Sequence, residues 1–292
     1  MNGFKKKIHK PIFIVGCGRS GTTIFYEIMA WHKDLAWISN YSNWYYSIFP
    51  YAAGLCVLYR SDFVKRLTGR RFPKPREGHR VWDWCHPVFE SPNDPPLDES
   101  DVTPKSSFRV RKMVIDHIRY SGKKRFINKN TRNSRRIRYL NAIFPDAKFI
   151  HIIRDGRAVV ASLNKFREKL TPWILKENEN LRLEDDADRN VEIAALLWMA
   201  ETNKILNDKE DLHPSQYCEI KYEDLMRSPV ATMKGVCRFC ELNWSDEYAE
   251  FIKRKQLKNF NYRFKERLTD NQISKVEKMI RIFSHNLGYK LD

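Results

Sequence analysis

A glycine-rich turn with one early cation is the first feature of this sequence that could bind an anion. The residues Gly16 and Gly18 open the turn directly after the apolar run Pro11–Val15. Small residues let the backbone wrap around an anion, and the N–H groups at the start of a following helix favour its negative charge. We therefore expect a phosphate-like group to be bound by Arg19, Ser20, Gly21, Thr22 and Thr23.

This turn departs from the nucleotide-binding P-loop at one decisive position. Gly16 and Gly21 have the spacing of G-x-x-x-x-G-K-[ST], but Thr22 stands where that pattern has lysine. Nucleotide kinases use that lysine on the β- and γ-phosphates and the next hydroxyl on magnesium. With Arg19 as its cation, the turn suits a phosphate with one further anionic group better than a magnesium triphosphate. A P-loop nucleotide kinase is kept as an alternative, to be tested by binding of ATP with magnesium.

A second anion site is indicated near residue 154. Arg154 directly follows the apolar run Lys148–Ile153, and Ser162 comes eight residues later, with Arg157 between them. Ligands of open α/β sheets gather at the carboxyl ends of strands, where an arginine can bind a phosphate with two hydrogen bonds. Ser162 would lie about two turns into the next helix. The alternative is an arginine that caps a strand and a helical serine that faces solvent.

Strands and helices alternate along most of the chain. We expect strands at Pro11–Val15, Arg125–Asn130, Lys148–Ile153 and Gln216–Tyr222. The expected helices are Thr22–His32, Ser134–Ile143, Gly156–Arg167, Asn190–Leu206, Val230–Leu242 and Asn271–Phe283. This alternation predicts an α/β fold with parallel strands joined by right-handed crossovers. We interpret residues 1–292 as a single domain.

Two segments do not follow the alternation. Tyr41–Pro104 is rich in aromatic residues, proline and charge, and the sequence up to residue 84 holds five of the eight tryptophans (31, 37, 44, 82 and 84). A long insertion of this kind is typical of a lid over an acceptor site, while packing in a small secondary core is an equal alternative. The polar and acidic segment Leu170–Asp188 is expected to be a mobile loop.

The bulk composition restricts the classes of function. The 292 residues carry a formal net charge of +17, which favours anionic ligands. A nucleic-acid-binding protein is an alternative, but no helix-turn-helix, zinc-finger or RNP pattern is present, and we expect no nucleic-acid partner. The pair Cys237 and Cys240 has no second ligand pair for zinc, so we place both cysteines in the core. No apolar run approaches the length of a membrane span or signal peptide, and we expect a cytoplasmic protein.

With both anion sites in view, the sequence resembles the family of sulfotransferases that use 3'-phosphoadenosine 5'-phosphosulfate (PAPS). GCGRSGTT is similar to the family's 5'-phosphosulfate loop, and FIHIIRDGRAVVASL is similar to its 3'-phosphate segment, including the spacing from Arg154 to Ser162. EIKYEDLMRSP is similar to the segment whose tyrosine, here Tyr222, lies near the adenine. The resemblance runs discontinuously from residue 11 to about residue 242. It is greatest to bacterial, tyrosylprotein and carbohydrate sulfotransferases.

This resemblance implies a P-loop-like central parallel sheet flanked by helices, PAPS as sulfuryl donor and no metal. It also implies a role for Lys129, which matches the family's strand lysine and would act on the sulfuryl group or the leaving oxygen. A phosphate-neutralising surface lysine is the alternative for this residue. The acceptor is expected to be a hydroxyl or amine, on a glycan, lipid, peptide or small molecule. The sequence does not predict the oligomeric state.

The general base is the part of the site that the resemblance does not supply. Some relatives place a histidine two residues after the lysine, where this chain has Thr131, and others a glutamate near ISNYSNW, which has no carboxylate. We choose Glu77, in PREGHRVWDW, with His79, His86 and Asp83 as substitutes. Burial beside Trp82 and Trp84 would move the pKa of such a group toward neutrality. An exposed loop charge is the alternative interpretation of Glu77.

Overall fold

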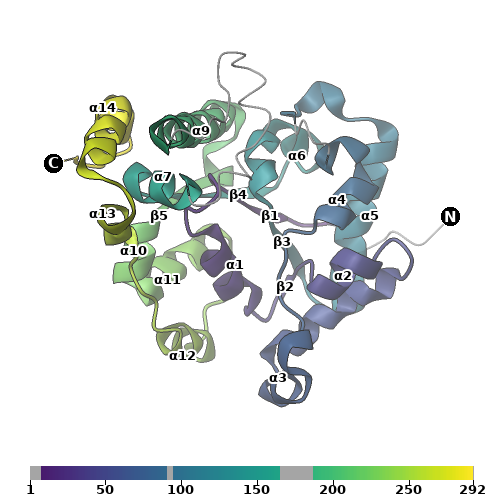
Figure 1. The fold of residues 1–292 in the computed structure, drawn as a ribbon. Coiled ribbons are helices and arrows are strands. Elements are labelled where there is room, and N and C mark those ends of the chain that lie inside the picture. Colours follow the sequence, from purple (N-terminus) through teal and green to yellow (C-terminus); the bar gives the residue numbers. More distant parts are fainter. Residues whose placement is uncertain (1–7, 91–94, 165–186, 292) are drawn as a thin grey trace.

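The computed structural model describes residues 8–90, 95–164 and 187–291. Within them, five strands form one parallel sheet in the order β2-β3-β1-β4-β5, and helices pack on both faces of this sheet (Figure 1). The strands are β1 (Ile12–Val15), β2 (Leu35–Ala36), β3 (Arg125–Lys129), β4 (Lys148–Ile153) and β5 (Tyr217–Lys221). The predicted α/β fold with a central parallel sheet is confirmed.

The helices that flank the sheet agree with most of the predicted ones. Those near predicted positions are α1 (Thr22–Ala30), α6 (Ile137–Ile143), α7 (Gly156–Asn164), α9 (Ala187–Asp208), α11 (Pro229–Phe239) and α14 (Asp270–Asn286). The predicted helix at residue 134 starts late, because Thr131–Arg135 forms a 3₁₀ turn (η5) first. The sequence analysis did not predict β2, α10 (Tyr222–Arg227), α12 (Asp246–Arg254) or α13 (Phe264–Arg267).

Strand β1 lies at the centre of the sheet and is apolar on both sides, as a doubly covered parallel strand requires. Phe13 and Val15 belong to a core shared with α6 and with two further helices, α4 (His79–Cys85) and α5 (Pro104–Ser121). Ile12 and Ile14 belong to an opposite core formed with α1, α11 and α12. A third core joins α7, α9 and α14 beside the sheet.

The register of the sheet brings three strand ends to one edge. Ile14 of β1 is paired with Lys129 of β3, and Val15 is paired with His151 of β4. All three strands run in the same direction, so the residues that follow them emerge together. The glycine turn, Lys129 and Arg154 therefore share the edge at which ligands of open α/β sheets bind.

The segment Tyr41–Pro104, whose sequence has only weak periodicity, folds largely as short helices. These are α2 (Asn40–Tyr45), the 3₁₀ helix η1 (Pro50–Arg60), α3 (Asp62–Thr68) and α4. Each is too short for a clear apolar period, and two of them start at local caps formed by Ser39 and Ser61. Trp82 is fully buried, and Trp37, just before the segment, is almost so. Trp82 joins the core that β1 shares with α5 and α6, so this ring serves packing as the alternative interpretation expected, although in the main core and not in a small secondary one.

Helix α5 is the longest element that the sequence analysis missed. It begins at a Thr103 cap with Pro104 in its first turn, and it ends at Gly122, whose φ is +67°. Its buried apolar side chains recur at three- and four-residue intervals, at Val110, Met113, Val114 and Ile118. The helical period was therefore present, but many charged residues surround it.

Two smaller predictions concern other parts of the chain. Residues 170–186 of the proposed mobile loop lie outside the described residues, while Ala187 and Asp188 begin α9. Cys237 and Cys240 are buried in the core that α11 shares with α1, as predicted. Among the residues that the structure describes, no helix combines the length and apolar character that crossing a membrane requires.

Candidate active site

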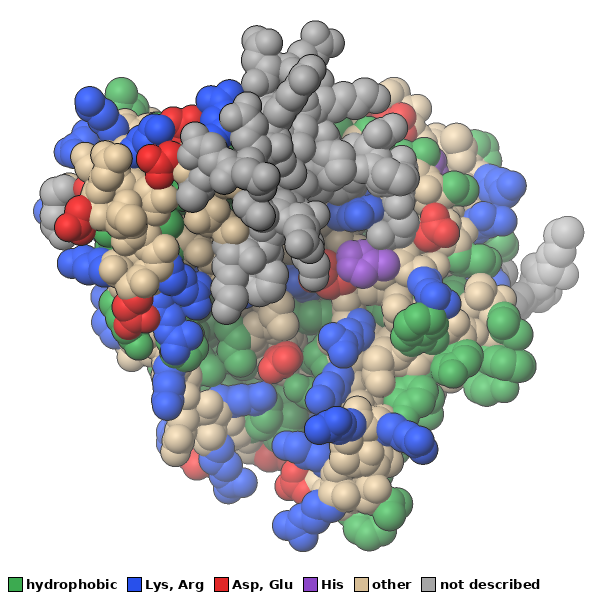
Figure 2. Space-filling model, in the orientation of Figure 1, with side chains coloured by type: hydrophobic (Ala, Val, Ile, Leu, Met, Phe, Trp, Pro, Cys, Tyr) green, Lys and Arg blue, Asp and Glu red, His purple; other side chains and the backbone are tan. Residues whose placement is uncertain are grey.

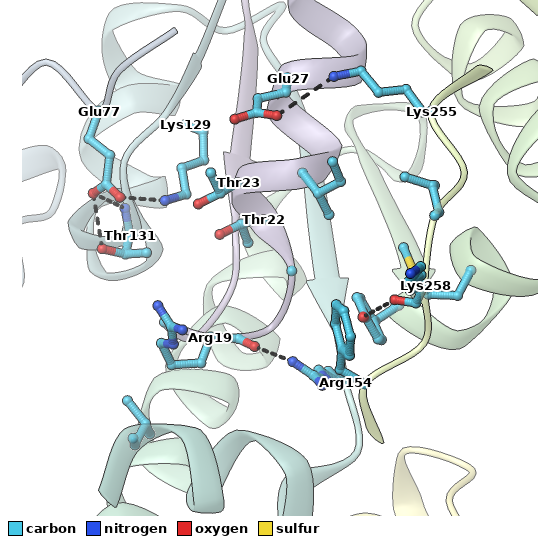
Figure 3. A pocket seen from close by; sticks show the side chains of 18 of the residues that line it. Arg19, Thr22, Thr23, Glu27, Glu77, Lys129, Thr131, Arg154, Lys255 and Lys258 are labelled. Atoms are coloured by element: carbon cyan, nitrogen blue, oxygen red, sulfur yellow. Dashed lines mark hydrogen bonds and ion pairs between the residues drawn. The ribbon is translucent and has the colours of Figure 1, made fainter. Parts of the chain in front are cut away.

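A pocket of about 770 Å³ lies at the carboxyl ends of β1, β3 and β4 (Figure 3). Its described lining carries five cations and two carboxylates, a formal excess of +3. The cations are Arg19, Lys129, Arg154, Lys255 and Lys258, and the carboxylates are Glu27 and Glu77. A concave site with this balance of charge is suited to a ligand that carries several negative charges.

The glycine turn forms one wall of the pocket, and two of its glycines cannot be replaced without strain. Gly16 has φ +147°, and a Cβ atom there would lie 2.6 Å from the carbonyl oxygen of Ile152. Gly21 has φ +89°, and its Cβ would lie 2.4 Å from the ring of Tyr222. These close approaches leave the start of α1, at Thr22 and Thr23, open to the pocket. The start of α1 therefore faces the pocket, an arrangement that suits an anion.

Arg19 links the turn to helix α7. Its backbone has φ +72°, a left-handed conformation that non-glycine residues rarely adopt and that often marks a functional position. Its side-chain Nε–H donates to Ser162 Oγ at 2.9 Å. Burial and the nearby charge of Arg267 lower the pKa of Arg19. A guanidinium held among like charges in this way is stabilised when an anion binds.

Arg154 joins the same corner from the end of β4. Its Nη1 donates to the carbonyl oxygen of Arg19 at 2.9 Å, and its Nε donates to Asn261 Oδ1 at 2.8 Å. The guanidinium lies over the ring of Tyr222, 4.3 Å from its centroid. Burial lowers the pKa of Arg154. Arg154 and Ser162 thus both contact Arg19: Arg154 binds the Arg19 backbone, and Ser162 binds the Arg19 side chain.

The predicted anion-binding residues do not all face the pocket. Ser20 is almost fully buried and its N–H donates to the carbonyl oxygen of Cys17, so it supports the turn from within. Ser162 lies behind the side chain of Arg19 and is reached through it. Arg157 forms ion pairs with Asp155 and Glu277 instead of turning to the pocket. The remaining predicted residues line the pocket: Arg19, Gly21, Thr22, Thr23, Arg154 and Tyr222.

Glu77 and Lys129 form an ion pair on the other side of the pocket. The Lys129 ammonium donates to Glu77 Oε1, while Thr131 Oγ1 and the Thr131 N–H donate to Oε2 at 3.3 and 3.4 Å. The Lys129 side chain is 5% exposed and that of Glu77 is 28% exposed. Asn128 Nδ2 donates a hydrogen bond to the backbone carbonyl oxygen of Glu77 at 3.2 Å. The insertion therefore delivers Glu77 to the end of β3 (Figure 3).

The expected direction of the Glu77 pKa shift is wrong. Burial alone would raise the pKa of this carboxyl, but the charge and hydrogen bond of Lys129 oppose it. His79 and the Thr131 N–H add to this effect, and the pKa lies below its ordinary value. Beside Lys129 the ionised form of Glu77 is favoured, and its proton affinity depends on how strongly Lys129 holds it.

The substitutes considered for the base lie less favourably. His79 Nε2 is 3.6 Å from Glu77 Oε2, but His79 is not among the residues that line the pocket. Asp83 is exposed and also absent from the lining. His86 packs against Phe89 and Tyr139, and burial lowers its pKa. Among the four candidates, Glu77 alone lines the pocket.

The segment that follows α12 supplies residues that the sequence analysis missed. Lys255, Lys258 and Phe260 line the pocket opposite the glycine turn, with Gln256 and Leu257 between them. Tyr222 Oη donates to the carbonyl oxygen of Lys258 at 3.2 Å, and Lys255 Nζ lies 3.8 Å from Glu27 Oε2. Four lysines and arginines within residues 253–258 were the available signal. No strand or motif directed attention to them.

The arrangement divides the pocket into two chemically different sides. Arg19, Arg154 and the turn present cations and N–H groups that suit phosphate-like groups. Lys129 and Glu77 place a proton donor beside a proton acceptor, as a group-transfer reaction needs for its leaving and attacking oxygens. Within the described part of the chain, no cluster of three or more His, Cys, Asp or Glu side chains could hold a metal ion.

Comparison with known proteins agrees with this geometry. The family model described as "Sulfotransferase family" matches residues 11–246. A relative from Mycobacterium bovis, omega-hydroxy-beta-dihydromenaquinone-9 sulfotransferase Stf3, is 26% identical over 249 residues. That match covers 77% of this chain but only 61% of the length of the relative.

Solved structures show the same fold. Sulfotransferase STF9 from Mycobacterium avium superposes with a TM-score of 0.65 at 15% identity, over 98% of this chain and 78% of that one. Mouse sulfotransferase SULT7A1 complexed with PAP superposes with a TM-score of 0.50 at 12% identity, over 95% of this chain and 84% of that one. At these identities the likeness concerns the fold.

Proposed function

The chain belongs to the sulfotransferase family, and we propose from this that it transfers a sulfuryl group from PAPS to an acceptor hydroxyl or amine. The observation that carries the proposal is the meeting of the glycine turn, Arg154 and the Lys129–Glu77 pair in one pocket. The relative from Mycobacterium bovis is named for a hydroxylated acceptor, which supports a hydroxyl over an amine. A cytoplasmic location and the absence of a nucleic-acid partner remain expectations from the sequence.

The pocket fits a donor of this kind in size and charge. Its volume of about 770 Å³ falls within the usual range for small-molecule sites, about 300–1,000 Å³. The excess of cations matches the several negative charges of a bisphosphorylated nucleotide. The space at Gly21, which a Cβ atom would fill, lets the ring of Tyr222 pack against the turn. Together these features support a nucleotide site along the turn and beside Tyr222.

In this proposal the two anion-binding regions hold opposite ends of the donor. Arg19, Thr22, Thr23 and the N–H groups of the turn, supported by Ser20, bind the 5'-phosphosulfate. Arg154 binds the 3'-phosphate, with Ser162 beside it. Tyr222 packs near the adenine. Bound PAPS supplies the sulfuryl group and a leaving oxygen on the 5'-phosphate.

The acceptor side carries out the proton and charge movements. Glu77 accepts the proton of the acceptor oxygen as that oxygen forms its bond to sulfur. Lys129 donates a hydrogen bond to the leaving oxygen as the sulfur–oxygen bond on the donor side breaks. When the Lys129 ammonium turns to that oxygen, Glu77 loses the contact that lowers its pKa, so its proton affinity rises as a base is needed. The segment Tyr41–Pro104, which carries Glu77, serves as the wall or lid of the acceptor site.

The decisive experiment incubates the purified chain with labelled PAPS and a panel of glycan, lipid, peptide and phenol acceptors. We expect label transfer to at least one class, and we expect transfer to survive EDTA because arginine, lysine and backbone N–H groups meet the anions. PAP should raise the melting temperature, because it binds the folded state. A folded chain whose melting temperature is unchanged by millimolar PAP but raised by ATP with magnesium would contradict the proposal.

A further inference from the structure

Exposed apolar side chains are concentrated in one region outside the pocket. Among the described residues, eight of the thirteen large hydrophobic side chains that are exposed lie between residues 44 and 67. Phe63 is 75% exposed, Leu67 is 74% exposed and Ile48 is 68% exposed. Single exposed apolar residues are ordinary, but a contiguous group of them marks a surface that contacts another phase or molecule. We name residues 44–71 the α2–α3 surface.

The geometry of α3 gives its exposed apolar side chains a common face. Phe63 and Leu67 are four residues apart on α3, so they project from the same side of that helix. Trp44 lies in the last turn of α2, and Ile48 lies in the turn that follows this helix. Helix α3 has no buried side chain at all, so its apolar residues do not contribute to the core. A soluble helix normally buries its apolar stripe, and α3 instead presents it outward.

Cations surround this apolar face. Lys65, Arg66, Arg70 and Arg71 are exposed, and none of them forms an ion pair with a carboxylate in the part of the chain that the structure describes. Residues 41–80 contain eight Lys and Arg against two Asp and Glu, a formal excess of +6. Figure 2 shows Lys and Arg side chains beside apolar ones at the lower end of the molecule, where Figure 1 places α3.

We propose that the α2–α3 surface docks on a lipid bilayer that contains anionic headgroups. Phe63 and Leu67 enter the boundary between headgroups and acyl chains, and Lys65 and Arg66 contact lipid phosphates. Trp44 and Tyr45 are of the aromatic types that favour this boundary. Exposed leucine and isoleucine side chains gain no stacking from a nucleic acid, and a second copy of the chain would bring like charges together. The bilayer matches both the apolar and the charged character.

The docking surface continues to the acceptor side of the pocket. The guanidinium of Arg80 lies 3.5 Å from the ring centroid of Trp44. Arg80 follows His79, whose Nε2 is 3.6 Å from Glu77 Oε2. A chain that rests on a bilayer through this surface therefore keeps Glu77 near the lipid phase. The docking itself does not depend on the proposed sulfuryl transfer and can be measured without a donor or an acceptor.

The test measures binding of the full chain to vesicles by flotation, without nucleotide. Vesicles of phosphatidylcholine are compared with vesicles in which about a third of the lipid is phosphatidylglycerol. We expect clear binding to the anionic vesicles only, and a loss of about tenfold or more in partitioning for Phe63→Ser/Leu67→Ser. Lys65→Gln/Arg66→Gln should lose about fivefold for each charge removed. Ile282→Ser, which changes an 80% exposed side chain on α14, is the matched control and should bind like the unmodified chain.

Three outcomes would overturn the proposal. The first is absence of binding to anionic vesicles by the unmodified chain. The second is equal binding by the Phe63→Ser/Leu67→Ser variant, or an equal loss for Ile282→Ser. The third is concentration-dependent self-association in solution that the Phe63→Ser/Leu67→Ser variant abolishes, because the face would then join two copies of the chain. A melting-temperature shift with PAP, measured on the same samples, shows separately whether the nucleotide pocket is intact.

Discussion

The two sides of the pocket hold their charges in opposite ways. On the donor side, Arg19 and Arg154 lie close together, and burial lowers the pKa of each guanidinium. On the acceptor side, Lys129 is matched by Glu77, and the pair is neutral as a unit. The donor side therefore gathers buried positive charge that an anionic ligand would stabilise. The acceptor side contains its own counter-charge, Glu77. The ion pair between Lys129 and Glu77 must break before Lys129 can donate a hydrogen bond to another oxygen.

The two sides of the pocket also depend on different parts of the chain for the position of their residues. The donor side is built at strand ends, where Gly16 and Arg154 directly follow β1 and β4. The acceptor side requires Glu77, which reaches β3 only because the long insertion folds back on it, held by a bridge between Ser39 and Pro75 and by Gly78 with φ +86°. Substitutions on the two sides should therefore affect different measurable quantities.

The largest effect is expected for Glu77→Gln, which keeps the shape of the side chain but removes its basicity. We expect the rate of sulfuryl transfer to fall by about 10²–10⁴-fold, the usual share of general-base catalysis. PAP affinity should be unchanged or slightly higher, because a negative charge leaves the pocket. The measurement is single-turnover transfer together with PAP titration by calorimetry.

Glu27→Gln is the matched control, since Glu27 is the other carboxylate of the described pocket lining and its contact with Lys255 is longer, at 3.8 Å. It should leave the transfer rate within a few fold of the unmodified chain. A Glu77→Gln variant that keeps its full rate, or that loses PAP affinity instead, would show that Glu77 is not the base.

The next effect concerns the donor side alone. Gly21→Ala places a Cβ atom 2.4 Å from the Tyr222 ring at a residue with φ +89°, so the turn and the ring must move apart. We expect about a 10²-fold loss of PAP affinity, the scale of a displacement of about 1 Å in a preorganised site. Gly122→Ala is the control, because Gly122 also has a positive φ, +67°, is absent from the pocket lining, and its Cβ would meet nothing within 4 Å. Equal affinities for the two variants would contradict the role assigned to the turn.

A smaller effect should distinguish the two ends of the donor. Arg154→Ala is expected to weaken PAP by about 2–3 kcal/mol, the scale of a charged hydrogen bond, and Ser162→Ala by about 1 kcal/mol. Both losses should be smaller for AMP, which lacks the 3'-phosphate to which these residues are assigned. Competition binding with both nucleotides measures this. Equal losses for PAP and AMP would mean that Arg154 acts through the Arg19 carbonyl that it holds.

The sequence predicted the donor side better than the acceptor side for a physical reason. The strand Lys148–Ile153 was predicted with its observed bounds, Arg154 was placed by its position directly after that strand, and Thr22 by its position at the end of the glycine turn. Such positions follow from local periodicity and from one rule of sheet topology. Lys255 and Lys258 could not be placed, because their approach depends on the packing of α12 far along the chain.

Glu77 is a second residue whose position could not be predicted from the local sequence. Its choice rested on the chemistry that the reaction needs, and its position in the pocket depends on contacts with Asn128, Lys129 and Thr131, more than fifty residues away. The expected pKa direction was wrong because burial beside tryptophans can be anticipated locally, whereas a buried lysine partner cannot. The short helices of the insertion were missed for a related reason, since their apolar residues are divided between the core and the exposed α2–α3 surface.

The smallest expected effect tests the neutral pair itself through the pH dependence of stability. The pKa of Glu77 in the folded chain lies below that of an unfolded glutamate, about 4.3. A group with a lowered folded pKa stabilises the fold above its unfolded pKa, and this contribution is lost as the pH falls through the folded value. The difference in unfolding free energy between the unmodified chain and Glu77→Gln should therefore shrink as the pH falls from 7 to about 4.

Urea unfolding at about pH 7, 5 and 4 measures this difference, with Glu27→Gln as a control whose partly exposed ion pair should contribute only about 0–1 kcal/mol at any of these values. A difference that grows on acidification would mean that burial, and not Lys129, sets the proton affinity of Glu77. Glu77 would then be a protonatable acid, and the acceptor side would not supply its own counter-charge. A shrinking difference instead supports a pair in which Lys129 keeps Glu77 ionised until another oxygen takes its place.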